Sequence, residues 1–270
     1  MCIYSLIPSL FPFLVLGNLI ASSDLSSFAS KIFSGVFRGV FHLSENLFTA
    51  YIIGLVCGYP AGCIAVCREY KRGGISQNEA ERAIILCTNA SPAFCLGVIG
   101  ASLGDIKTGV NIYLLQILSG AVTAQILPKC KLFAKNKKCT DKIPFTTAFC
   151  NAITGSVQPT FNICAFVIFF SVTAQFIGNY LSNLGFSRYA ISVVMSLAEL
   201  SCGVNSARLL SAFYPACISA FAVGFSGLCV IMQLKAICTE YKVFPRFFTL
   251  YKLLSGIILA LFTFFVSLII

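Results

Sequence analysis

The chain has 270 residues, of which 58% are hydrophobic and 10% are charged. Soluble domains carry about 25% charged residues, so this composition excludes an ordinary soluble protein and indicates a polytopic membrane protein. The formal net charge of +10 does not indicate a nucleic-acid partner, because the basic residues lie in short loops between apolar runs, where we expect contact with anionic lipids of the bilayer.

Four apolar runs in the first half of the chain predict helices. Before the second run, residues 25–41 repeat apolar side chains at helical spacing with Lys31 and Arg38 on the opposite face, which predicts an amphipathic helix in the membrane interface. Ser76 and Glu79 have the spacing of a capping box and predict the start of the third helix. The four runs cover residues 3–22, 46–66, 83–104 and 109–127.

The second half of the chain has the same order of parts. A basic connector at 128–143 separates the halves and is expected on the cytoplasmic side. Two short echoes support a duplication, because residues 5–8 resemble 156–159 and residues 114–120 resemble 250–256. We therefore predict one membrane repeat at 1–127 and a second at 144–270, with apolar runs in the second at 144–178, 189–210, 212–233 and 247–270.

The second run of each half is interrupted by small and polar residues, at 58–62 (GYPAG) and at 199–205 (ELSCGVN). If these segments cross the membrane, each repeat has four spans and the repeats are parallel, whereas re-entrant hairpins leave three spans and make the repeats inverted. The hairpin arrangement places 16 of the 19 lysine and arginine residues inside, against 11 of 19 for full crossings. We therefore expect an all-α polytopic membrane protein with two inverted repeats, each with about three transmembrane helices plus a broken or re-entrant helical hairpin.

The first interruption offers backbone groups. Glycine and proline weaken the helix, so carbonyl and amide groups near Gly58, Tyr59, Pro60 and Gly62 lose their helical partners and become candidates for contact with a solute or an ion. The alternative is a tight packing bend in which the glycines let helices approach closely.

The second interruption offers an ionisable group. Glu199 is the one acidic residue of nine that lies inside an apolar run, where a carboxylate must be protonated, paired or hydrated. Together with Gly203 and Asn205, it is a candidate for proton or cation coupling, or for a hydrogen bond to a polar solute. The alternative is a structural carboxyl satisfied by Arg208 or by backbone groups freed at 201–205.

Polar residues also interrupt the third run of each half. Asn89 and Ser91 precede Pro92 and are candidate binding residues, and the counterpart in the second half is the Ser-Gly pair at 226–227 with Gln233. The alternative is that these side chains only bond neighbouring helices.

The sequence carries no enzyme signature. It contains no Walker loop, HExxH pair or GxSxG elbow, and its single histidine is His42. Its 14 cysteines form no Cys-x-x-Cys motif, and although Cys63 and Cys67 share a helix face, no acidic or histidine cluster accompanies them. We expect no catalytic residues, no cofactor and no metal site.

The chain carries SLFPF at 9–13, GYPAG at 58–62, TNASPAF at 88–94 and LAELSCGVNSARLL at 197–210. In this order the motifs resemble the sporulation integral membrane protein YlbJ family over essentially the whole chain. The resemblance implies the nucleoside recognition or Gate domain that concentrative nucleoside transporters also contain. It further implies a bacterial multi-pass protein of the cytoplasmic membrane with a part in spore cortex formation.

On this basis we expect a secondary transporter or permease for a small polar solute rather than an enzyme. The alternative is a non-transporting membrane scaffold or a subunit of a larger spore-envelope complex. The resemblance does not name the solute, because a shared domain does not fix the substrate. The coupling ion, the direction of transport and the formation of a homo-oligomer stay open.

Overall fold

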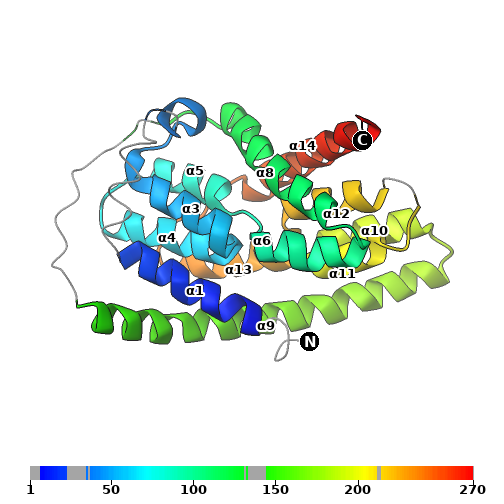
Figure 1. The fold of residues 1–270 in the computed structure, drawn as a ribbon, viewed down its shortest axis with the longest axis horizontal. Coiled ribbons are helices and arrows are strands. Elements are labelled where there is room, and N and C mark those ends of the chain that lie inside the picture. The colour runs from blue at the N-terminus through cyan, green and yellow to red at the C-terminus, as the bar shows by residue number, and fades with distance from the viewer. Residues whose placement is uncertain are drawn as a thin grey trace. The chain divides into compact units, whose positions relative to one another are not determined.

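A computed structural model describes residues 7–22, 35, 37–130, 132, 144–211 and 214–269 (Figure 1). These residues are mainly helical and contain no β-strand, which confirms the all-α expectation. Most of the predicted amphipathic helix at 25–41 and of the connector at 128–143 lies outside the described residues. The described end of the amphipathic segment places Phe37 and Phe41 against Tyr51, with ring centroids 5.5 and 4.7 Å from the tyrosine ring.

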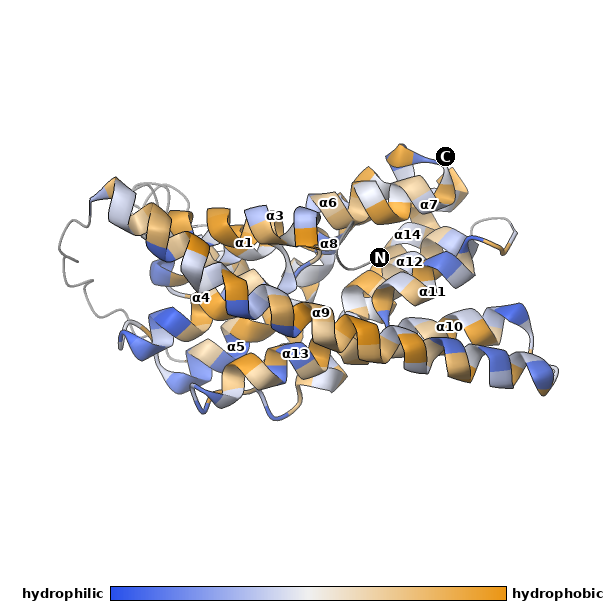
Figure 2. Ribbon diagram, turned by 90° about the horizontal axis from the view of Figure 1, so that it is seen from below, coloured by the Kyte–Doolittle hydropathy of each residue, from blue (hydrophilic) through white to orange (hydrophobic). Residues whose placement is uncertain are grey.

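Within the described ranges, five helical segments are long and apolar enough to cross a membrane. A sixth apolar helix, α1 (Ile7–Ser22), has 16 described residues. In Figure 2 the long helices are coloured mainly as hydrophobic, and hydrophilic residues gather at several helix ends and loops. The five segments are α5 (Gln77–Cys87) continuing through α6 (Pro92–Phe94), the π-helix η3 (Cys95–Gly100) and α7 (Ala101–Leu103); α8 (Ile106–Ile126); α9 (Phe145–Asn183); α12 (Tyr214–Phe225) with α13 (Gly227–Thr239); and α14 (Phe248–Ile269).

The two interrupted runs form helical hairpins. α3 (Phe48–Cys57), which follows the 3-10 turn η2 (Glu45–Leu47), packs against α4 (Tyr59–Lys71), and α10 (Arg188–Ala198) packs against α11 (Leu200–Ala207). The longest of these arms, α4, has 13 residues and spans about 20 Å, well short of a hydrocarbon core of about 30 Å. The structure therefore supports the hairpin interpretation over full crossings. The inverted relation of the repeats stays a prediction.

The chain forms two compact units, and each draws on both halves of the sequence. Each unit contains one hairpin. The two units therefore do not coincide with the predicted sequence repeats at 1–127 and 144–270. Unit 1 consists of Met1–Asn89, Ala124–Cys164 and Leu234–Arg246, and unit 2 consists of Ala90–Thr123, Ala165–Gln233 and Phe247–Ile270.

Two buried charged residues of α5 organise unit 1. Ser76 caps α5 by accepting a hydrogen bond from the Glu79 amide at 3.3 Å, as the capping box predicts. The Glu79 carboxylate accepts from the Ser44 amide at 2.7 Å. The Arg82 guanidinium donates to the main-chain carbonyl groups of Phe41, Ala124, Leu127 and Pro128. These bonds fix α5, and with it the helix end that contacts the first hairpin.

In unit 2, the two copies of one sequence echo meet. The Ser119 hydroxyl of α8 donates to the Ser255 carbonyl of α14 at 3.1 Å. Glycine permits a second close approach, because a Cβ on Gly224 of α12 would lie 2.6 Å from the Cα of Gly256 in α14. Ser119 and Ser255 occupy equivalent positions of the echo, and the duplication itself stays a prediction.

Candidate functional site

The GYPAG segment forms the tip of the first hairpin, in unit 1. Gly58 ends α3 and precedes α4 with a φ of 95°, a conformation that favours glycine. Pro60 occupies the first turn of α4, where its missing amide is tolerated, and Tyr59 is buried. Gly62 has a packing role: a Cβ there would overlap the Cys87 carbonyl oxygen at the end of α5.

The helix break after α5 is satisfied by its own side chains. The Thr88 hydroxyl and the Asn89 amide group donate to carbonyls in the last turn of α5, at 2.8 and 2.9 Å. Ser91, which belongs to unit 2, caps α6 by accepting from the Phe94 amide at 3.3 Å. Asn89 is half-buried, and its side-chain oxygen makes no hydrogen bond to the described part of the chain.

Gln116 of α8 completes this break within unit 2, although the sequence did not single it out. Its side-chain oxygen accepts from the Ala90 amide at 3.0 Å, and its side-chain nitrogen donates to the Ala90 carbonyl at 2.9 Å. Both backbone groups of Ala90 are therefore paired without a solute. The available signal was a glutamine inside an apolar run, which in a membrane needs a polar partner.

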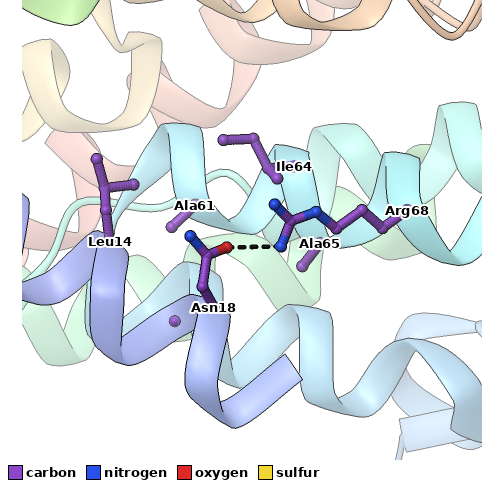
Figure 3. A pocket seen from close by; sticks show the side chains of 7 residues that line it. Leu14, Asn18, Ala61, Ile64, Ala65 and Arg68 are labelled. Carbon is purple, nitrogen blue, oxygen red and sulfur yellow. Dashed lines mark hydrogen bonds between the residues drawn. The ribbon is translucent and has the colours of Figure 1, made fainter. Parts of the chain in front are cut away.

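A small pocket lies between α1 and α4 in unit 1 (Figure 3). The Arg68 guanidinium donates to Asn18 Oδ1 at 2.5 Å, and Asn18 Nδ2 donates to the Ser156 hydroxyl of α9 at 2.8 Å. The other lining side chains are apolar, so this is a polar link between three helices more than a solute cavity. The pocket is lined by Leu14, Gly17, Asn18, Ala61, Ile64, Ala65 and Arg68.

Glu199 forms the tip of the second hairpin, in unit 2. It separates α10 from α11 and is 3% exposed. Its carboxylate caps α11 by accepting from the Cys202 amide at 2.7 Å, at a helix end whose dipole favours negative charge. No ion pair joins Glu199 to a cation among the described residues, and Arg208 is exposed at the other end of α11. The backbone, and not Arg208, is therefore its structural partner.

A second break in unit 2 packs against this tip. Ser226 and Gly227 interrupt the helix between α12 and α13 with φ values of 77° and 69°. A Cβ on Gly227 would lie 3.3 Å from the Leu200 amide nitrogen, directly beside Glu199. The Ser226 hydroxyl is fully buried and has no hydrogen-bond partner in the described residues. Two breaks therefore meet here. One carries the buried Glu199 carboxylate, and the other carries the buried Ser226 hydroxyl, which has no hydrogen-bond partner among the described residues.

The remaining predicted residues do not join Glu199. Gly203 lets α11 approach α10, because a Cβ there would overlap Ser196. Asn205 is exposed, and its side-chain oxygen accepts from the Ser102 hydroxyl at 3.4 Å. Asn205 lies six residues after Glu199, which is about 240° beyond one full helical turn, so Asn205 faces away from the carboxylate. Gln233 lies on α13, the helix that follows the Ser226 break, and its side-chain nitrogen donates to the Cys229 sulfur at 3.2 Å.

No family model matches the chain. The sporulation integral membrane protein YlbJ of Bacillus subtilis (strain 168) is 23% identical over 297 aligned positions, which cover 94% of this chain and 72% of that protein. The chain is a relative of YlbJ. The similarity to YlbJ supports the family resemblance that the four motifs carry, and with the long apolar helices it supports a multi-pass bacterial membrane protein.

A solved structure of doubly substituted CNTnw in an outward-facing state has the same fold. The TM-score is 0.61 with 14% sequence identity, and the match covers 98% of this chain and 77% of CNTnw. At this identity the likeness concerns the fold alone. Neither YlbJ nor CNTnw is described as an enzyme.

Proposed function

We propose that the chain is a secondary transporter or permease for a small polar solute, with Glu199 as a binding or coupling group. The fold shared with CNTnw supports transport as a class of function. Breaks that meet inside a membrane domain are the usual location of transporter sites. The relation to YlbJ supports a role of this transport in sporulation, and the family resemblance directs the proposal to formation of the spore cortex.

The observation that carries the proposal is the environment of Glu199. Serine, threonine, aspartate or asparagine would cap α11 as well, so capping alone does not require a glutamate. A buried carboxylate without a cation among the described residues is costly in a membrane domain, and such residues usually serve a proton, an ion or a polar ligand. The Ser226 hydroxyl, which is buried and has no hydrogen-bond partner among the described residues, lies on the break that packs against this tip and offers a second group to such a ligand.

The alternative is a non-transporting scaffold or a subunit of a larger spore-envelope complex. It is favoured by the break after α5, where Thr88, Asn89 and Ser91 bond the local backbone and need no solute. In this case Glu199 serves only as a helix cap, and its replacement by glutamine leaves function in the cell intact.

Uptake into proteoliposomes tests the proposal. Comparing the metabolites of cells with and without the protein would nominate the solute, and its uptake would then be measured across pH with and without a proton gradient. We expect Glu199→Gln to abolish the gradient dependence, while Glu240→Gln, at an exposed acidic residue, retains it. Uptake by Glu199→Gln equal to that of the unaltered protein at every pH would rule out coupling through Glu199. Absence of uptake, combined with full rescue of sporulation by Glu199→Gln, would favour the scaffold.

A further inference from the structure

Three cysteines from two helices meet in unit 1. Cys63 and Cys67 lie four residues apart on one face of α4, and Cys238 lies in the last turn of α13. The Cys238 sulfur is 3.4 Å from that of Cys63 and 3.9 Å from that of Cys67. All three sulfurs lie within 4.8 Å of one another, and all three residues are fully buried and free of disulfides.

These separations fit three thiolates around one metal ion. With metal–sulfur bonds of about 2.3 Å, the three sulfurs of a planar trigonal site lie about 4.0 Å apart. The Cys238 sulfur is 0.6 and 0.1 Å closer than this to the sulfurs of Cys63 and Cys67, and the third pair lies within 4.8 Å, so shifts of less than 1 Å would complete the site. Single buried cysteines are common as small apolar side chains, but that role does not bring three sulfurs together.

The set of donor atoms selects the metal. Structural zinc takes four ligands, and in the described part of the chain no histidine, aspartate or glutamate joins these three sulfurs. Hard cations such as magnesium and calcium prefer oxygen ligands, whereas soft thiolates select Cu(I). We propose that Cys63, Cys67 and Cys238 form a binding site for the soft monovalent cation Cu(I), held by three thiolates.

The surroundings suit such a site. Three thiolates around one Cu(I) leave a net negative charge, and after Cys67 the last turn of α4 carries Arg68 and Lys71, followed by Arg72 at the C-cap. Cys238 is followed by the exposed residues Thr239 and Glu240, so the site lies next to a surface loop. A bound ion would join the second arm of the first hairpin to the end of α13.

Titration with Cu(I) tests the site. The full chain, purified in detergent without oxygen, would be titrated with Cu(I) against bicinchoninate as a competing chelator. We expect one tightly held Cu(I) per chain and X-ray absorption that gives about three sulfur neighbours at about 2.3 Å. Cys63→Ser, Cys67→Ser and Cys238→Ser should each weaken binding at least tenfold, whereas Cys57→Ser, buried in the same unit outside the group, should bind as the unaltered protein does.

Three results would overturn the proposal. The first is unchanged Cu(I) affinity when all three cysteines are replaced together. The second is an absorption spectrum of the unaltered protein with nitrogen or oxygen neighbours in place of sulfur. The third is preferential retention of zinc with four ligands. Because the spectrum is recorded on the unaltered protein, it decides the matter even where a serine variant fails to fold.

Discussion

Replacing Gly62 by alanine adds one methyl group at a crowded point of the first hairpin. The new Cβ would overlap the Cys87 carbonyl oxygen and would lie 2.7 Å from the Cα of Gly54 and 3.1 Å from the Cys87 carbonyl carbon. All of these are main-chain atoms, so no side chain can rotate to make room. The arms of the hairpin, or the end of α5, must therefore move.

The magnitude follows from these distances. Ordinary carbon contacts begin at 3.4 Å, so α3 and α4 must separate by at least about 0.7 Å at Gly54. Overpacking of this kind costs about 3 kcal/mol, at the upper end of the usual range. At about 2–4 °C per kcal/mol for a domain near this size, the melting temperature should fall by about 6–12 °C.

Thermal unfolding in detergent, followed with a thiol-reactive dye that reports exposure of the buried cysteines, measures this change. The matched control is Gly120→Ala in α8, where a Cβ meets nothing within 4 Å. That change should leave the free energy of unfolding unchanged or raise it by up to about 1 kcal/mol, because alanine favours helix over glycine. A Gly62→Ala protein that melts within about 1 °C of the unaltered one would refute the close packing of the hairpin on α5.

Three further predictions concern other parts of the fold. Gln116→Leu should lower the free energy of unfolding by about 2–5 kcal/mol in the same melting assay, because it leaves two buried backbone groups unpaired; an unchanged melting temperature would contradict this pairing. Hydrogen bonds from the Thr108 hydroxyl and from amides at the start of α8 hold the pKa of Asp105 below its usual value. The stabilising effect of Asp105 should therefore be present above about pH 4 and lost as the pH falls through the lower pKa of the folded protein, so Asp105→Asn should melt below the unaltered protein only above that range. Finally, single cysteines placed at Ser182 and Asn136 in a cysteine-free background should be labelled from opposite sides of the membrane, and labelling from one side would contradict the predicted topology.

Much of the fold could be predicted because membrane helices leave a local signal. A run of about 20 apolar residues has few alternatives in a bilayer, and two glycines with a proline between them at 58–62 interrupt a helix without reference to the rest of the chain. The hairpin at Glu199 was predictable for a related reason, since an isolated carboxylate in an apolar run demands backbone or solvent around it.

The remaining details depend on residues far apart in the sequence. Nothing near Gln116 indicates that it pairs with Ala90, and Cys238 lies 171 residues after Cys67, so the three-cysteine group could not be read from spacing. Gly62 and Gly203 were candidate binding residues, with close helix approach as the alternative for Gly62, and the structure places both at helix contacts. Their role depends on which helix packs opposite, and that is a property of tertiary structure.

The length of α9 has a consequence for the surrounding membrane. Its 39 residues contain no charged side chain and extend over about 58 Å, almost twice the thickness of the hydrocarbon core. Even at a tilt of about 40°, the steepest commonly observed, a core of about 30 Å accommodates only about 26 residues of helix. About 13 residues of α9 must then project into the headgroup region or thicken the bilayer locally, which makes the protein sensitive to the thickness of the membrane that holds it.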